Sequence, residues 1–345
     1  MPDESAAVAS GAADAAPDPG VSAAGYRALQ EGAVVIDRSD RLRMRFSGAR
    51  AAETLNGLLT NEVTALAPGT GQYALALTPK GKIVADVRVL ALPDALLLDT
   101  SERAAPGWSA LVRKYVNPRL ARYEDVSAEL GDLGLFGAAC LEVLRQATGA
   151  GETIPHDLAP YGHVPIDLGG VPVTVVRSPD YGVAGYDVFG DPATLEALRQ
   201  HLASVGSVMD PGEALLVSRI EAGRPEWGVD MDESTLAQEA DMERLGAISF
   251  TKGCYTGQET VARVHFRGHV NRLLRGLRFA GDTVPSPGSE LVSADGKPVA
   301  VISSSARSPT HGVIALALVR REVEPGTTLH TAGAGAIVVE LPFRN

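Results

Sequence analysis

The segment 252–259, Lys-Gly-Cys-Tyr-Thr-Gly-Gln-Glu, holds residue types that nucleophilic and recognition chemistry require. Cys254 is a candidate nucleophile, and Lys252 favours its thiolate if the fold brings the two side chains together. Gln258 and Glu259 offer donors and acceptors of the kind that bind a planar heterocycle. Two interpretations of Cys254 stay open, a reactive thiol and a small buried apolar side chain.

Asp86 is a second candidate for chemistry. The runs 72–78 and 82–90 flank Pro-Lys-Gly and predict a β-hairpin. Alternation along the second strand places Asp86 on the same face as Val84 and Arg88. The opposite face is then formed by Ile83, Ala85, Val87 and Val89. On the residues alone, Asp86 is interpreted as a solvent-facing carboxylate paired with Arg88.

Arg219 and Glu221 lie in a predicted helix, 213–221, whose apolar residues fall on one face. Two residues apart on a helix, these side chains point in different directions. One of them is therefore free to face a ligand while the other makes a structural bond. An inter-domain salt bridge is the alternative interpretation.

Composition limits the classes of function. The chain has 345 residues, 45% of them hydrophobic, and a net charge of −11, which disfavours nucleic acid and anionic membranes as partners. Its two cysteines cannot form a disulfide framework or supply four thiolates to an iron–sulfur cluster. The N-terminus lacks the pattern of a signal peptide, and no apolar run reaches the ~20 residues of a membrane span, so we expect a cytoplasmic protein.

Local patterns predict a helix over about 48–59, a strand at 95–99, a helix containing 111–116, strands at 171–176 and 186–189, and a helix beginning at Pro192. From residue 271, short apolar runs separated by Gly-containing turns predict a small all-β domain. The predicted division is a disordered tail (1–24), a discontinuous α+β domain (25–46 plus 126–235), a second α+β domain (47–125), a signature segment (236–270) and a C-terminal β-domain (271–345).

Four stretches together resemble one known family. The run 252–260 (KGCYTGQET) is similar to the signature of the YgfZ/GcvT-like folate-binding family, and 219–228 (RIEAGRPEWG) resembles a segment that this family shares with the glycine-cleavage aminomethyltransferase. The stretches 58–73 and 79–86 resemble the N-terminal part of the same family. The resemblance implies an α+β fold, with several domains in a ring around a central cavity and a small C-terminal β-barrel.

The resemblance also implies a function. Members of this family support iron–sulfur proteins, so we expect a protein that binds tetrahydrofolate, or a one-carbon-substituted folate, and assists assembly or repair of iron–sulfur cluster proteins. Its partners would be iron–sulfur enzymes or assembly proteins. The expected catalytic residues are Cys254 and Asp86. The expected folate-binding residues are Arg219, Glu221, Lys252, Tyr255, Gln258 and Glu259. No metal site is predicted, because Gly268 interrupts the helix that would align His265 with His269.

Two alternatives remain, and whether the chain is an enzyme stays open. The first is a folate-dependent one-carbon transferase, because Asp86 matches the second aspartate of the Gly-Gly-Ile-x-Asp-Asp stretch in the related aminomethyltransferase. Against it, Tyr186 falls where that enzyme has the glutamate of its Tyr-Thr-Gly-Glu stretch. The second is a thiol-redox protein that uses Cys254. Its only internal partner would be Cys140, whose apolar neighbours suggest burial.

Overall fold

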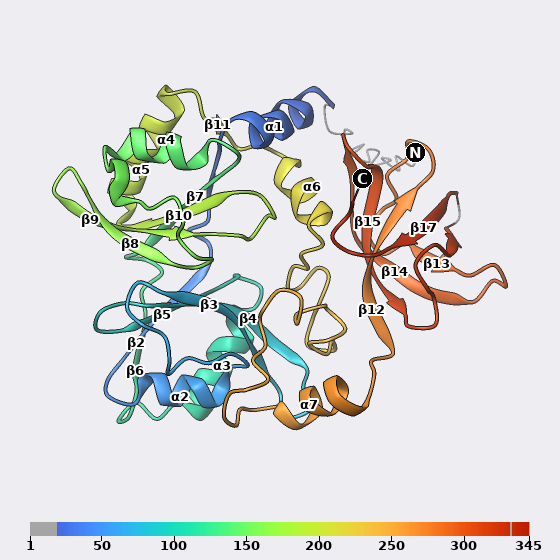
Figure 1. The fold of residues 1–345 in the computed structure, drawn as a ribbon, viewed down its shortest axis with the longest axis horizontal. Coiled ribbons are helices and arrows are strands. Elements are labelled where there is room, and N and C mark those ends of the chain that lie inside the picture. Colours follow the sequence, from blue (N-terminus) through green and yellow to red (C-terminus); the bar gives the residue numbers. More distant parts are fainter. Residues whose placement is uncertain (1–18, 332, 345) are drawn as a thin grey trace, which may run out of the picture.

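A computed structural model describes residues 19–331 and 333–344, which form two open β-sheets and one closed barrel (Figure 1). The two sheets lie one above the other on the left of Figure 1, and the barrel lies on the right. Much of the segment 222–257 lies between the two sheets and the barrel. The predicted tail falls mostly outside the described residues, and helix α1 (Pro19–Glu31) begins within its last part.

The first sheet is built from two separated parts of the chain. Its strand order is β11-β1-β7-β10-β9-β8. The bounds are β1 (Val34–Asp37), β7 (Gly131–Phe136), β8 (His163–Leu168), β9 (Val171–Arg177), β10 (Gly185–Gly190) and β11 (Val208–Met209). Helices α4 (Cys140–Thr148) and α5 (Pro192–Ser204) pack against β7 and β10. Helix α5 begins where sequence predicts, because Asp191 accepts hydrogen bonds from the backbone N–H groups of Ala193 and Thr194. A short 3₁₀ helix, η1 (Gly151–Thr153), follows α4, and α6 (Ala214–Glu221) leads out of this part.

The second sheet is formed entirely by residues that lie between β1 and β7 in the sequence. Its strand order is β3-β4-β5-β2-β6. The bounds are β2 (Leu42–Ser47), β3 (Gly71–Leu77), β4 (Ile83–Ala91), β5 (Leu96–Thr100) and β6 (Arg122–Asp125), with helices α2 (Ala51–Leu58) and α3 (Ala105–Tyr115). The predicted hairpin is confirmed as β3–β4. The five-part division of the chain stays a prediction, and β2, which crosses its boundary at residue 46, pairs with β5 and β6.

A bulge changes the predicted faces of β4. The register shifts opposite Ala76 and Leu77, so Ile83 and Ala85 are not related by simple alternation. Ala85, Val87 and Val89 pack in the core beneath α2 and α3, whereas Ile83 joins the core on the other face of the sheet. The prediction that Ile83 shares the face of Ala85 is therefore wrong.

The predicted C-terminal β-domain is confirmed as a closed six-stranded barrel, in the order β12-β15-β14-β13-β16-β17. Its strands are β12 (Arg272–Phe279), β13 (Glu290–Val292), β14 (Pro298–Ser308), β15 (Gly312–Arg320), β16 (Thr328–His330) and β17 (Gly335–Val339). Closure leaves no unpaired sheet edge and encloses an apolar core. Helix α7 (Gln258–Arg267) precedes the barrel.

A buried set of ion pairs joins the two sheets. We call it the inter-sheet ion network, and it consists of Arg38, Arg41, Arg43, Arg88, Asp99, Asp132, Asp180 and Asp187. Arg88 on β4 donates to Asp99 at 2.7 Å within its own sheet. It also donates to Asp132 at 3.0 Å and to Asp187, both in the first sheet. Among the described residues, Arg88 forms no ion pair with Asp86, contrary to the interpretation made from the residues alone.

Burial and neighbouring charges act oppositely on the aspartates of this network. Burial alone would raise the pKa of Asp99, but the charges of Arg41 and Arg88 hold it well below the ordinary aspartate value. Asp132 differs, because burial and the charge of Asp187 raise its pKa to about 7. The arginines are therefore required to keep several carboxylates ionised at a largely buried interface.

We predict that Arg88→Met destabilises the protein by about 3–5 kcal/mol, since it leaves buried carboxylates without their cation. Urea-induced unfolding followed by circular dichroism measures the loss. Arg50→Met is the control, because Arg50 pairs with Glu53 on the exposed surface and its removal should leave the unfolding midpoint near that of the wild type. Equal midpoints for the two variants would contradict the structural role given to Arg88.

Candidate functional site

A cavity of about 380 Å³ lies where the two sheets meet the segment that follows α6. Its walls come from the end of β1 and the turn after it, from β3 and β4, and from residues 224–227. The lining residues include Tyr73, Asp86, Arg88, Arg219, Arg224 and Trp227. Two of the predicted site residues, Asp86 and Arg219, are thus brought to one cavity by segments 133 positions apart in sequence.

Asp86 has one satisfied and one unsatisfied carboxylate oxygen. Tyr73 on the neighbouring strand donates its hydroxyl to Oδ2 at 2.7 Å. Oδ1 is buried and has no hydrogen-bond partner in residues 19–331 and 333–344. Burial raises the pKa of Asp86 above the ordinary aspartate value, and the Tyr73 hydrogen bond offsets part of that rise. A carboxylate with a raised pKa and a free oxygen is suited to general acid–base chemistry.

Aromatic packing holds Tyr73 in place beside Asp86. Its ring stacks on that of Tyr161, with centroids 6.1 Å apart and an interplanar angle of 17°. The guanidinium of Arg224 lies over the Tyr73 ring, 6.0 Å from its centroid. Burial, followed by the charge of Asp86, raises the pKa of Tyr73 well above the ordinary value, so its hydroxyl stays a donor. The orientation of Asp86 is therefore fixed from β3.

Arg219 lines the cavity, but its guanidinium is occupied by protein groups. It forms an ion pair with Asp230 and donates to Ser304 on β14 at 2.8 Å and to the carbonyl oxygen of Arg224 at 2.8 Å. These bonds join α6, the segment 222–230 and the barrel. Glu221 points elsewhere, as predicted for its spacing, and accepts from Tyr26 at 3.0 Å and from Ser308. Glu221 does not line the cavity.

Trp227 is a cavity residue that the sequence reasoning did not single out. It packs against the cores on both sides of the second sheet. Its indole Nε1 is buried, with no acceptor among the residues that the structure describes. The sequence does contain a signal for this residue. Trp227 is a large aromatic side chain in a polar run that contains Gly and Pro, within the stretch 219–228 that resembles the family.

The signature segment 252–259 lies outside this cavity and clamps a loop of the second sheet. Lys252 is buried, and its ammonium donates to the carbonyl oxygens of Asn56, Leu59 and Asn61 at 2.7, 2.7 and 2.9 Å. Burial lowers the pKa of Lys252 to about 8. Among the described residues, no hydrogen bond joins Lys252 to Cys254.

The other residues of the segment 252–259 differ in how deeply their side chains are buried. Tyr255 is buried in the core shared with β3 and β4, and burial raises its pKa to about 12. Gly257 has φ +87°, and a Cβ there would lie 2.6 Å from the carbonyl oxygen of Thr78, so only glycine fits. Gln258 and Glu259 form the first turn of α7, and Glu259 is exposed. None of these side chains lines the cavity.

Cys254 is exposed, which excludes the interpretation of a buried apolar side chain. Cys140, at the start of α4, is buried, and burial raises the pKa of its thiol to about 11. The two thiols differ accordingly: one is available to solvent or a partner and the other is enclosed in the core of the first sheet.

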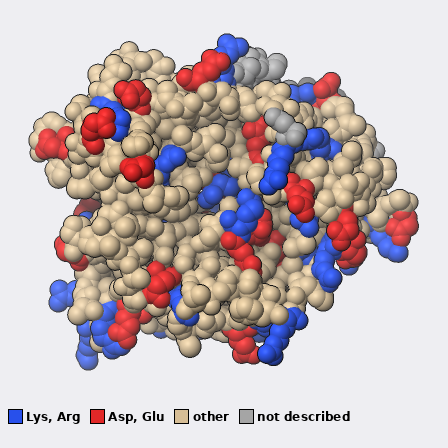
Figure 2. Space-filling model, in the orientation of Figure 1, with Lys and Arg blue, Asp and Glu red and all other residues tan. Residues whose placement is uncertain are grey.

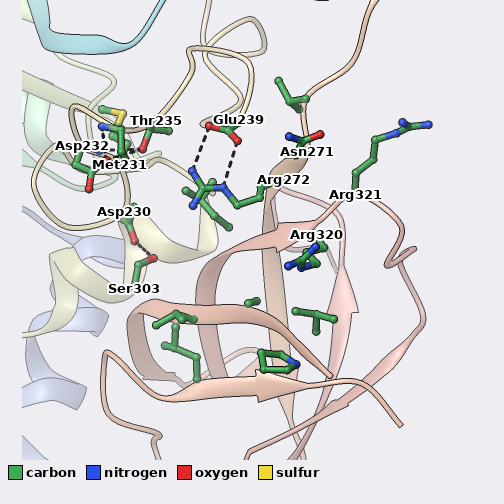
Figure 3. Close-up of a pocket in the computed structure, with 18 of the residues that line it drawn as sticks. Asp230, Met231, Asp232, Thr235, Glu239, Asn271, Arg272, Ser303, Arg320 and Arg321 are labelled. Atoms are coloured by element: carbon green, nitrogen blue, oxygen red, sulfur yellow. Dashed lines mark hydrogen bonds and ion pairs between the residues drawn. The ribbon is translucent and has the colours of Figure 1, made fainter. Parts of the chain in front are cut away.

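A larger cavity of about 1230 Å³ lies between residues 228–239, residues 269–272 and the barrel (Figure 3). Some of its polar groups are bound to one another. Arg272 donates to Glu239 at 3.2 and 3.3 Å, and Ser303 donates to Asp230. It contains none of the predicted site residues. We therefore take the smaller cavity as the candidate site.

The charges on one face and the metal-ligating side chains of the described residues do not indicate a competing site. On the face shown in Figure 2, acidic and basic side chains are interspersed. No group of three or more His, Cys, Asp and Glu side chains in the described residues is placed to hold a metal ion. No helix in that part of the chain is long and apolar enough to cross a membrane.

Curated relatives are similar over nearly the whole chain. An aminomethyltransferase of Saccharopolyspora erythraea is 28% identical over 335 residues, covering 93% of this chain and 89% of that protein. An aminomethyltransferase of Frankia alni is 29% identical over 340 residues, covering 92% of this chain and 87% of its own. The YgfZ part of the resemblance stays a prediction.

The fold is that of a solved relative. The crystal structure of glycine cleavage system aminomethyltransferase T from Bartonella henselae superimposes with a TM-score of 0.82, at 20% identity, and covers 94% of this chain and 89% of its own. This match confirms the α+β architecture with a C-terminal barrel. The sequence also matches the family model described as GCVT N-terminal domain over residues 18–252, more than half of the chain. The protein therefore belongs to the GCVT N-terminal domain family.

Proposed function

We propose that this protein binds a tetrahydrofolate, or a one-carbon-substituted folate, in the cavity of Asp86 and catalyses folate-dependent one-carbon transfer of the aminomethyltransferase type. The observation that carries the proposal is Oδ1 of Asp86, which is buried at the cavity without a hydrogen-bond partner among the described residues. Curated relatives named aminomethyltransferase support the reaction class. Of the functions considered from sequence, this alternative has more support than the iron–sulfur role.

The residues around the cavity fit the head group of a folate. Its volume of about 380 Å³ lies in the range of ordinary ligand pockets. Tyr73 and Trp227 provide aromatic surface, Asp86 provides an acceptor, and Trp227 also provides a donor. A pterin ring presents both apolar faces and hydrogen-bonding edges, so these groups suit it. Folate, when bound, supplies the nitrogen that carries the one-carbon unit.

Asp86 is the group that we assign to proton transfer. In its ionised form, Oδ1 accepts a proton, and in its protonated form it returns one. Tyr73 holds Oδ2 and so leaves Oδ1 as the reacting oxygen. Burial of the carboxyl group raises its pKa above the ordinary aspartate value, which favours proton uptake by Oδ1.

We predict that the purified protein binds reduced folate and that Asp86→Asn weakens this binding about 10-fold, because an amide replaces the charged acceptor. Isothermal titration calorimetry with tetrahydrofolate, from a few micromolar to about millimolar, covers plausible affinities. Asp295→Asn is the control, since Asp295 is exposed in a barrel turn and pairs with Lys297. Absence of heat and of thermal stabilisation in the wild type would refute folate binding.

We also predict a pH dependence set by Asp86. If its ionised form accepts the proton, one-carbon transfer falls as pH falls through a pKa above the ordinary aspartate value. Tyr73→Phe removes a hydrogen bond that lowers this pKa, so the acidic limb should move to higher pH. Asp86→Asn should reduce kcat by about 10²–10⁴-fold. An acidic limb that stays in place in Tyr73→Phe would exclude Asp86 as the titrating base.

A second candidate function rests on a separate observation, the exposure of Cys254. Its neighbours Lys252 and Tyr255 are fixed by packing, while Cys254 itself is presented to solvent. An exposed thiol is suited to contact with a partner, as the predicted role in assembly or repair of iron–sulfur proteins requires. The thiol-redox alternative has less support, because the buried Cys140 offers no accessible internal partner.

This second function predicts that cells lacking the protein lose activity in a subset of iron–sulfur enzymes, and that Cys254→Ala does not restore it. Substituting an exposed side chain should change stability by only about 0.5 kcal/mol, so the variant stays folded. Enzyme assays in complemented cells measure the effect, with Cys140→Ser as the comparison for the buried thiol. Full restoration by Cys254→Ala would remove the support for this role.

A further inference from the structure

Ten buried side-chain nitrogen and oxygen atoms lack a hydrogen-bond partner among the described residues, and only two belong to side chains that line the candidate site. These are Oδ1 of Asp86, an acceptor, and Nε1 of Trp227, a donor. From this pair we infer that Trp227 is a specificity-determining residue that donates its indole N–H to the ring carbonyl oxygen of a bound pterin. The inference rests on the proposed folate site.

The segment that carries Trp227 is held rigidly. Asp230, which is paired with Arg219, accepts from the backbone N–H of Glu226 at 3.0 Å. The backbone of Trp227 forms an isolated bridge with Met231, and the carbonyl of Met231 accepts from Gly228 at 2.7 Å. A donor on such a segment is preorganised, so it does not have to be ordered when a ligand arrives.

A buried donor without an acceptor is costly, and a ligand that provides the acceptor removes this cost. Indole nitrogen only donates, so the matching ligand atom must be an acceptor. In a tetrahydropterin the carbonyl at position 4 lies beside the N–H at position 5, which places an acceptor and a donor on one edge. Trp227 and the ionised Asp86 are the complementary donor and acceptor.

A hydrogen bond from Trp227 predicts that the site discriminates between two related folates, which folate binding alone does not predict. In the 4-amino analogue of tetrahydrofolate an amino group replaces the carbonyl oxygen, so the ligand presents a donor where Trp227 also presents a donor. Sites built to hydrogen-bond one group reject an analogue that lacks it, because the protein group is left unpaired. The wild type should therefore prefer the 4-oxo compound.

The experiment compares the dissociation constants of tetrahydrofolate and its 4-amino analogue by calorimetry. We expect the wild type to bind the 4-oxo compound about 10-fold more tightly. Trp227→Phe keeps the aromatic surface and removes the N–H, so it should weaken tetrahydrofolate binding about 10-fold and bring the ratio of the two constants near 1. Trp108→Phe makes the same change at the other tryptophan, which is buried among core residues away from the cavity, and should leave the ratio unchanged.

Trp108→Phe also provides a second measurement, since Trp227 is then the sole tryptophan. Its fluorescence should change on addition of tetrahydrofolate, and this readout does not depend on whether Trp227→Phe folds. No binding of tetrahydrofolate to the wild type would overturn the proposed function. Binding with equal constants for the two ligands, or an unchanged ratio in a folded Trp227→Phe, would overturn the role of Trp227 alone.

Discussion

The position of the two sheets depends on Arg88 and the carboxylates around it. One guanidinium reaches Asp99 in its own sheet and both Asp132 and Asp187 in the other, with all four side chains buried. Breaking such an arrangement leaves charges without water or counter-ion, so the two sheets cannot separate or slide without a large cost. The candidate cavity opens at this same junction, because Arg88 also forms part of its wall. The ion network therefore also holds the wall of the cavity in place.

This arrangement separates the charged groups by role. Two arginines that border the cavity are bound to protein carboxylates, Arg88 to Asp99 and Arg219 to Asp230. Among the described residues that line the cavity, the buried side-chain atoms left without a partner are a carboxylate oxygen of Asp86 and the indole N–H of Trp227. The ion pairs fix the shape of the site, and these two atoms are available for recognition and proton transfer. Buried polar atoms without a partner are uncommon in folded proteins, so the two at the cavity are candidates for contact with a ligand.

Sequence predicts the parts of this fold that depend on near neighbours. The β3–β4 hairpin and the barrel follow from alternation and turn residues, and α5 follows from its capping residues. Pairings between distant segments were not predictable. Arg88 and Asp187 lie 99 positions apart, and Lys252 reaches carbonyls more than 190 positions away. Pattern rules also failed at Ile83, where a bulge breaks the alternation. For the site, sequence predicted a catalytic Asp86 and a folate-binding Arg219, and both line the cavity. Whether a side chain is already bound or still unsatisfied depends on three-dimensional packing.

The signature segment has one position that packing does not determine. Lys252 ties a loop, Tyr255 fills a core and Gly257 passes a carbonyl oxygen too closely for any other residue, so each is needed by the fold itself. Cys254, between them, is exposed to solvent. A protein that used this segment only as a clamp would keep the pattern around position 254 while that position drifted among small and polar residues. A cysteine kept at position 254 among relatives would therefore reflect a role other than folding.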